Sequence, residues 1–283
     1  MVAHDTGTAP SGELRIFYRR LGHPGRLPVL IVHGLSYFSY DWLPVAARLS
    51  SDREVACMDM RGFGDSGWSS TWDYSVPSMA SDIVAVLDHL GWRRVALVGH
   101  SMGGRSSTYA AAKRPERVAG LALIDFSPEN AAAGSKRVAQ SVGNTPETFA
   151  TIDDAMRYFG KMDRARFENY LRKTAEGYAV KRDPFFRDQF RAVLSGGERP
   201  KLGVDLWQLL GEVRCPLLSM RGARSDLYAA ETKAKMQAAN PRLRIVEVDA
   251  GHDIAGENPE GFLAALAPFL ESLEEKSHEH ARH

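Results

Sequence analysis

Cysteine is scarce in this 283-residue chain, and a long apolar run is missing altogether. The only two cysteines are Cys57, inside a predicted strand, and Cys215, at the start of another, and neither stands in a Cys-x-x-Cys or Cys/His spacing. This usage is typical of buried thiols in a reducing compartment and argues against a disulfide framework or a structural metal. Residues 1–14 lack the apolar core of a signal peptide, and no segment is long enough to span a bilayer. We therefore expect a cytoplasmic protein without metal or membrane association.

An excess of charge of one sign is also absent. The chain has 36 Lys and Arg against 35 Asp and Glu, a formal net charge of +1. Such a balance gives no reason to expect a nucleic acid or an anionic membrane surface as partner. The length suits one large domain, or one domain that carries an insertion. We expect a small-molecule substrate and a monomer or homodimer.

What is present is an alternation of strand-like and helix-like segments. Candidate strands cover Leu14–Arg20, Pro28–Val32, Arg53–Met58, Arg94–Val98, Val118–Asp125, Leu217–Arg221 and Arg244–Val248. Candidate helices between and after them cover Pro77–Leu90, Met102–Lys113, Ala229–Ala239 and Pro259–Leu273. This order predicts an α/β fold with a mostly parallel sheet and helices on both faces.

The alternation stops after Ser127, and from 128 to 211 apolar residues recur at helical spacing without a strand signal. Predicted helices in this stretch cover Glu147–Gly160, Arg164–Val180 and Pro184–Leu194. We interpret 128–211 as a helical cap inserted into a core formed by 1–127 and 212–273. Residues 274–283 are polar and are expected to be a disordered tail.

The cap is rich in aromatic residues, which favours a largely apolar pocket beneath it. Its arginines alternate with acidic residues, and we interpret them as solvated helix faces, with anchoring of a substrate carboxylate by one of them as the alternative. These residues are Arg157, Arg164, Arg166, Arg182 and Arg187.

A Gly-x-Ser-x-Gly motif with Ser101 at its centre follows the apolar run 95–98 and precedes a helix-forming stretch. A strand, a tight turn and a helix in this order hold the serine hydroxyl in a strained backbone conformation above the helix N-terminus. A serine is a weak nucleophile near neutral pH and needs a general base that a third group orients.

The base and its partner are sought at the same edge of the sheet. His252 follows the last predicted strand, so it should lie on a loop at the carboxyl edge where Ser101 also lies. Two carboxylates compete to orient it. Asp226 is favoured because it follows a strand and shortly precedes His252, and Asp125, at the end of an earlier strand, is the alternative acid.

The negative charge of a transition state needs donors near the serine. Leu35 lies in the loop after the second strong apolar strand, which should run beside Ser101. Met102 opens the helix after Ser101. The backbone N–H groups of Leu35 and Met102 are therefore expected to form an oxyanion hole.

Several motifs together resemble the α/β-hydrolase fold family, most closely its compact esterase, lactonase and carbon–carbon-hydrolase members with a helical cap. These motifs are His33-Gly34, the segment Asp59–Ser66, the segment Gly99–Gly104 and Gly251-His252. The resemblance runs from about Leu14 to Leu273. It implies a nucleophile, an acid, a base and two oxyanion donors at Ser101, Asp226, His252, Leu35 and Met102.

The identity of the nucleophile limits the reaction. A serine that attacked an sp³ carbon would form an ether that activated water could not cleave, which argues against epoxide opening and dehalogenation. The glycine-rich segment Asp59–Ser66 lacks the lysine of a phosphate-binding loop, and we expect no cofactor. The sequence predicts hydrolysis of a small, largely apolar ester or lactone through an acyl-enzyme. The alternatives are a carbon–carbon bond hydrolase, a lyase or cyclase, and a ligand receptor on the same fold.

Overall fold

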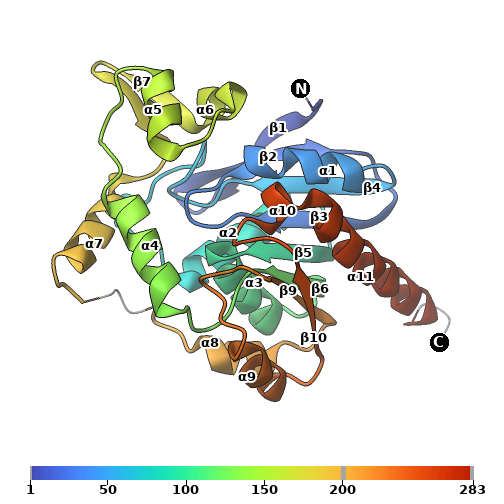
Figure 1. Ribbon diagram of the computed structural model, residues 1–283. Helices are drawn as coiled ribbons and strands as arrows, with labels where there is room; N and C mark the ends of the chain where they lie inside the picture. Colours follow the sequence, from blue (N-terminus) through green and yellow to red (C-terminus); the bar gives the residue numbers. More distant parts are fainter. Residues whose placement is uncertain (1, 199–201, 281–283) are drawn as a thin grey trace.

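A computed structural model describes residues 2–198 and 202–280 of the chain. Its centre is an eight-stranded sheet in the order β1-β2-β4-β3-β5-β6-β9-β10 (Figure 1). The strands are β1 (Asp5–Ser11), β2 (Leu14–Leu21), β3 (Arg26–Val32), β4 (Arg53–Met58), β5 (Val95–His100), β6 (Val118–Ile124), β9 (Leu217–Gly222) and β10 (Leu243–Val248). The pairs β1–β2 and β2–β4 are antiparallel, and every pair from β4 to β10 is parallel. The predicted α/β fold with a mostly parallel sheet is confirmed.

Helices cover both faces of this sheet. One face carries α2 (Val76–His89), α3 (Met102–Lys113), α8 (Leu206–Glu212) and α9 (Thr232–Ala239), and the other carries η1 (Ser39–Trp42), α1 (Leu43–Leu49), α10 (Ile254–Glu257) and α11 (Pro259–His280). Strand β5 shows why both faces need a cover. Its Val95 and Leu97 pack into one apolar cluster, and its Ala96 and Val98 pack into the other. Alternate side chains point to opposite faces, so a strand that is apolar throughout is buried on both.

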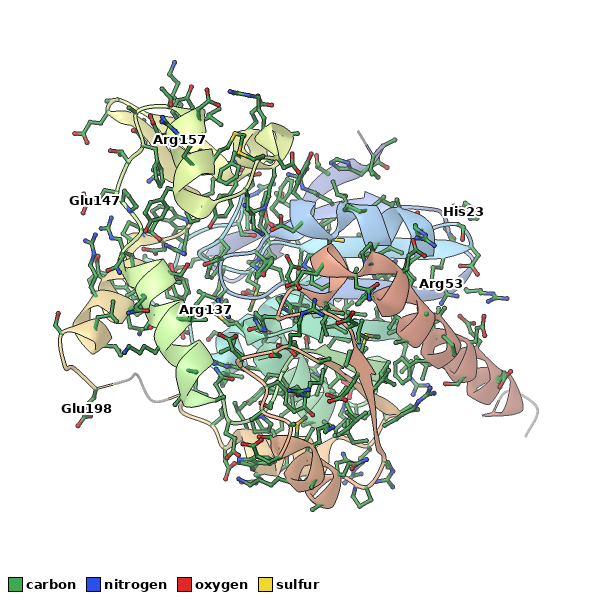
Figure 2. The ribbon with its side chains drawn as sticks, viewed as in Figure 1. His23, Arg53, Arg137, Glu147, Arg157 and Glu198 are labelled. Atoms are coloured by element: carbon green, nitrogen blue, oxygen red, sulfur yellow. The ribbon has the colours of Figure 1, made fainter. Side chains whose placement is uncertain are left out.

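The cap follows β6 and lies beside the carboxyl ends of the central strands (Figure 1). It comprises α4 (Ala132–Gly143), α5 (Ile152–Phe159), α6 (Arg164–Tyr170), β7 (Leu171–Thr174), β8 (Gly177–Val180) and α7 (Pro184–Leu194). Figure 2 shows Glu147 and Arg157 on the outer side of this cap and Arg137 on α4 nearer the core. The insertion therefore forms a wall over one end of the sheet.

Three sequence expectations about these boundaries need correction. The predicted helix Arg164–Val180 ends at Tyr170, and the antiparallel hairpin β7–β8 follows, with Gly177 at the start of β8 in a backbone conformation of φ 131° that favours glycine. Helix α8 contributes Leu206 and Leu209 to the apolar core beside α3, so the cap ends before Leu206 and not at 211.

The third correction concerns the chain end. Helix α11 continues through His280, so residues 274–280 of the expected disordered tail are helical, and 281–283 lie outside the described residues. In the part of the chain that the structure describes, no helix combines the length and apolarity that crossing a bilayer requires.

Candidate active site

Ser101 occupies a sharp turn between β5 and α3. Its φ of 50° and ψ of −113° lie in a region that side-chain-bearing residues rarely adopt, so the turn is strained. The surrounding packing requires glycine on both sides. A Cβ at Gly103 would lie 2.3 Å from the carbonyl oxygen of Val32, and one at Gly99 would lie 2.6 Å from a neighbouring hydroxyl on α3. Close packing thus holds the serine at the apex of the turn.

His252 lies on the loop after β10 and contacts Asp125, the residue that follows β6. The Nδ1–H of His252 donates to Oδ2 of Asp125 across 2.6 Å. The same carboxylate accepts from the N–H of Gly222 at 2.9 Å and from the hydroxyl of Ser225 at 2.5 Å. Asp125 is buried and itself adopts a positive φ of 42°. This pairing fixes the imidazole plane and leaves Nε2 as the ring nitrogen available to a substrate.

Asp226, the carboxylate that the sequence favours as the acid, does not contact His252. Its two oxygens accept from Nε and Nη2 of Arg137 on α4 at 2.6 and 2.8 Å. The Arg137 guanidinium holds the pKa of Asp226 below its ordinary value. The structure therefore pairs His252 with Asp125, the alternative that the sequence offers, and not with the favoured Asp226, which binds Arg137 on the cap.

The two expected oxyanion donors lie beside Ser101. Leu35 and Met102 both line the cavity that Ser101 lines, and the loop that carries Leu35 approaches so closely that a Cβ at Gly34 would lie 2.9 Å from Cβ of Ser101. Within the described ranges, no acceptor is hydrogen-bonded to the backbone N–H of Leu35 or Met102. Both N–H groups are free to bind a substrate oxygen.

His100 supports the backbone of His252. Its Nε2–H donates to the carbonyl oxygen of His252 at 3.1 Å, and its buried Nδ1 has no hydrogen-bond partner among the described residues. Burial lowers the pKa of His100 well below its ordinary value, so the ring is neutral. Sequence reasoning missed His100 and Ser225 as supports of the site. Ser225 lies in the short loop that follows β9, and a serine in that place is the sequence feature that indicates such a support.

A second pair of buried groups braces the neighbouring loops. His33 donates from Nδ1 to the carbonyl of Gly34 at 2.8 Å and accepts from the N–H of Met60 at Nε2, 2.9 Å away. Burial lowers the pKa of His33 to about 4. Asp59 accepts two backbone N–H groups, and burial raises its pKa to about 6. Neither side chain lines the cavity, so both serve the loops and not the reaction.

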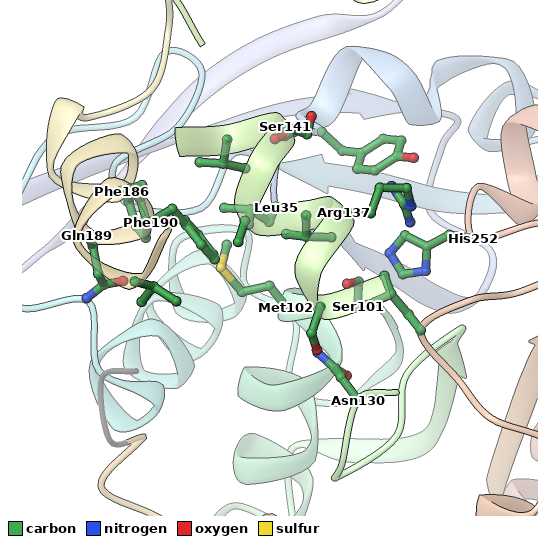
Figure 3. Close-up of a pocket in the computed structure, with 18 of the residues that line it drawn as sticks. Leu35, Ser101, Met102, Asn130, Arg137, Ser141, Phe186, Gln189, Phe190 and His252 are labelled. Carbon is green, nitrogen blue, oxygen red and sulfur yellow. The ribbon is translucent and has the colours of Figure 1, made fainter. Parts of the chain in front are cut away.

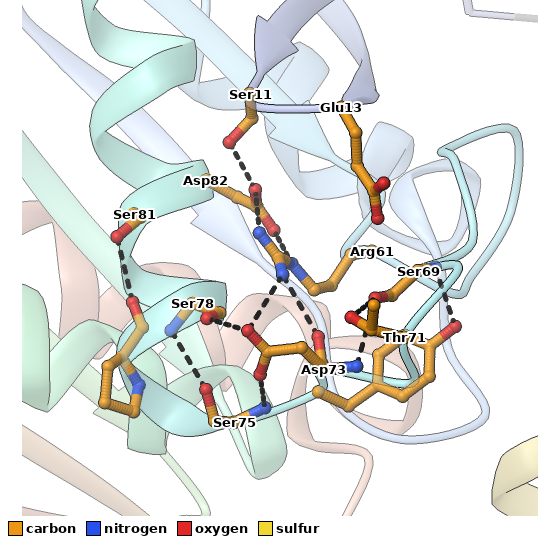
Figure 4. A network of polar contacts seen from close by, with 12 residues as sticks. Ser11, Glu13, Arg61, Ser69, Thr71, Asp73, Ser75, Ser78, Ser81 and Asp82 are labelled. Carbon is orange, nitrogen blue, oxygen red and sulfur yellow. Dashed lines mark hydrogen bonds and ion pairs between the residues drawn. The ribbon is translucent and has the colours of Figure 1, made fainter.

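The glycine-rich segment 59–66 is a structural turn. Arg61 in it forms two hydrogen bonds to the Asp82 carboxylate on α2, at 2.6 and 2.8 Å, and donates to the carbonyl of Asp73, while Ser11 donates to Asp82 from β1 (Figure 4). The backbone of Gly64 in turn donates to the cap at the carbonyl of residue 181. This network ties the segment to α2, β1 and the cap.

A cavity of about 600 Å³ extends from Ser101 and His252 toward the cap. Figure 3 shows Ser101 and His252 at one end of it and Phe186, Gln189 and Phe190 on α7 at the other. The sequence predicts a largely apolar pocket, but charged side chains line it as well. Four cations also line the cavity, and among its described lining residues there is no Asp or Glu; the cations are Arg105, Arg137, Lys161 and Arg166.

Two cap arginines depart from the expected solvated position. Arg166 is buried and donates to Asp41, with Nε 2.5 Å from Oδ1. Arg182 is buried as well and donates to the hydroxyls of Ser36 and Thr145 at 3.0 and 3.1 Å. Burial is possible because each guanidinium finds oxygen acceptors between cap and core. Among the described residues, no group of three or more metal-ligating side chains could hold an ion.

The strand order, the serine turn and the inserted cap define an α/β-hydrolase architecture. The chain belongs to the alpha/beta hydrolase fold family, whose model matches residues 28–259. It is similar to the 3-hydroxybutyrate-oligomer hydrolase of Cupriavidus necator, with 30% identity over 266 residues that cover 86% of this chain and 89% of the relative. It is also similar to the N-formylmaleamate deformylase of Pseudomonas putida, with 29% identity over 94% of this chain and 96% of the relative. Among solved structures, an E-2-(acetamidomethylene)succinate hydrolase superposes with a TM-score of 0.83 at 26% identity, covering 95% of this chain and all of that one.

Proposed function

We propose that this hydrolase cleaves small carboxylic esters, lactones included, with Ser101 as nucleophile, His252 as general base and Asp125 as the acid that orients it. The observation that carries the proposal is the 2.6 Å contact between His252 and Asp125 at a cavity that Ser101 also lines. The names of the relatives support the class, since an oligomer hydrolase and a deformylase both act on acyl bonds.

The first half of the reaction acylates the serine. Nε2 of His252 takes the proton of the Ser101 hydroxyl as its oxygen attacks the substrate carbonyl carbon. The carbonyl oxygen becomes an oxyanion that the N–H groups of Leu35 and Met102 stabilise, each by about 3 kcal/mol. Asp125 stabilises the imidazolium. Collapse of the tetrahedral intermediate breaks the ester bond, and the leaving alkoxide takes the proton from His252.

The second half releases the acid. Water attacks the acyl carbon while His252 takes one of its protons, and a second oxyanion forms between the same two N–H groups. Collapse breaks the bond to the serine oxygen, which recovers its proton from His252. The products are a carboxylic acid and an alcohol, and the enzyme returns to its starting protonation state.

A fluorophosphonate probe and a panel of short-chain esters test this proposal. We expect the probe to label one serine, with the added mass on the peptide that contains Ser101, and Ser101→Ala to abolish both labelling and turnover. Ser81→Ala, which removes an exposed hydroxyl on α2, is the matched control and should retain both. A wild-type protein that neither reacts with the probe nor turns over any ester, lactone or thioester would overturn the proposal.

A further inference from the structure

Three of the four cations that line the cavity have carboxylate partners. Arg137 forms two hydrogen bonds to Asp226, and Arg166 is paired with Asp41. Lys161 lies 3.8 Å from a carboxylate oxygen of the residue after His252 and is about half exposed. Their charges are therefore offset within the protein.

Arg105 differs from the other three. It lies on α3, lines the cavity and is only partly exposed. Among the side chains that the structure describes, none forms a hydrogen bond, ion pair or cation–π contact with its guanidinium, and burial is the one influence on its pKa. Burial without a partner lowers the pKa of Arg105, yet an arginine keeps its charge in proteins. A desolvated charge without a counter-charge destabilises a fold. Because Arg105 lines the cavity, an anion that binds there from outside the protein could supply the counter-charge.

Arg105 lies where an anion bound to its guanidinium would be close to Ser101. It follows Ser101 by four residues, which is about one helical turn, or a rise of about 6 Å along α3. Side chains of a helix lean toward its N-terminus, and here that direction leads back toward Met102 and Ser101. A guanidinium presents a planar fork of donors that matches the two oxygens of a carboxylate.

We propose that Arg105 binds a carboxylate of the substrate, and that the enzyme acts on short acyl compounds that carry a carboxylate a few bonds away from the scissile carbonyl. The described residues that line the cavity include no acid, so the charge of Arg105 is not offset there and favours the same substrate class. This inference rests on the proposed function for the site of cleavage, but the binding of the carboxylate can be tested without turnover.

Two esters of equal chain length separate charge from size. Methyl hydrogen hexanedioate carries a free carboxylate, and methyl hexanoate does not. We expect the wild-type kcat/KM to be at least about tenfold higher for the first ester, as hydrogen bonds to a charged group imply. Arg105→Met should reduce this ratio toward one, and Arg105→Lys should restore part of it, because a lysine supplies charge without the bidentate fork.

Two control variants locate the effect. Arg114→Met removes the same charge from the far, exposed end of α3, and the ratio should stay within about twofold of wild type. Lys161→Met removes a cavity cation whose nearest carboxylate oxygen lies 3.8 Å away. A ratio that collapses in Lys161→Met but not in Arg105→Met would overturn the assignment to Arg105.

Binding to the inactive Ser101→Ala protein separates this inference from the proposed function. Hexanedioate should raise the melting temperature of Ser101→Ala and should raise it far less when Arg105→Met is added, whereas hexanediamide should raise neither. If Ser101 cleaves both esters equally well and hexanedioate has no effect, the inference is wrong and the proposed function stands. If hexanedioate binds through Arg105 but neither ester is cleaved, the proposed function is wrong.

Discussion

Nδ1 of His252 lies 2.6 Å from Oδ2 of Asp125, a residue 127 positions earlier in the chain. The contact joins the loop after β10 to the end of β6, two strands away in the sheet. Gly222 and Ser225, from the strand between them and its loop, donate to the same carboxylate. The orientation of the imidazole therefore depends on one aspartate that two further donors, Gly222 and Ser225, hold in place.

Replacement of Asp125 should lower kcat more than any other single substitution except replacement of Ser101 or His252. Asp125→Asn should lower kcat by about 10³–10⁴-fold, because an amide neither holds the imidazole in the right tautomer nor stabilises its charged form. Asp226→Asn should change kcat by less than about fivefold, since it breaks a half-exposed ion pair with Arg137. Steady-state ester kinetics decide between them, and the opposite ranking would return the role to Asp226.

Ser225 should contribute through the aspartate. Ser225→Ala removes the hydroxyl that donates to Oδ2 of Asp125, and a hydrogen bond to a charged group is worth about 1.5–3 kcal/mol. We expect kcat to fall by about tenfold or more while KM changes little. Ser225→Thr keeps a hydroxyl and should recover most of the activity. Equal kcat values for the alanine variant and wild type would contradict this role.

A methyl group at Gly34 should disturb the oxyanion donors. Its Cβ would lie 2.7 Å from Nδ1 of His100 and 2.9 Å from Cβ of Ser101, so the loop that carries Leu35 must shift. Loss of one such donor lowers kcat by about 10²–10³-fold, and we expect Gly34→Ala to approach that loss. Gly211→Ala is the control, because its added Cβ meets only one carbonyl, at 3.2 Å. Kinetics with a thermal melt for both variants would show whether the effect is local.

His33 should make stability depend on pH. Its pKa of about 4 in the fold lies below the ordinary 6.5, so its contribution is present above pH 6.5 and is lost as the pH falls toward 4. His33→Gln keeps one donor and one acceptor but does not titrate. The free energy of unfolding of wild type relative to this variant should fall by about 3 kcal/mol between pH 7 and pH 4.

Urea unfolding at several pH values measures this difference. Wild type alone will show a flatter profile, because the raised pKa of Asp59, about 6, acts in the opposite direction over the same range. The contribution of Asp59 is present at low pH and is lost as the pH rises through 6. Parallel curves for wild type and His33→Gln would show that His33 does not titrate with unfolding.

The strands and the serine turn could be predicted from the sequence because they depend on local pattern. The helix Met102–Lys113 has the predicted bounds, and the fully buried strands β5 and β6 are central in the sheet. The sequence does not indicate the edge strand β1, because Asp5–Ser11 is polar and lacks a strand pattern.

The choice of acid could not be predicted, because it depends on side-chain direction at the edge of the sheet. Strands β6 and β9 are parallel neighbours with Ile124 opposite Met220, so both Asp125 and the loop of Asp226 emerge beside each other. Asp125 contacts His252, while Asp226 is bound by Arg137 on α4. That contact spans 89 positions and involves a cap arginine, so no spacing in the sequence indicates it.

The four cations around the cavity have a consequence for encounter as well as for affinity. Carboxylates offset three of them, but the charge of Arg105 is not offset by a described lining residue, and such a charge at a confined site raises the local concentration of oppositely charged molecules before any contact forms. Added electrolyte weakens that attraction over distances beyond about 8–10 Å, while bonds formed inside the cavity are screened much less. Ionic strength should therefore slow the capture of anionic compounds and leave neutral ones nearly unaffected.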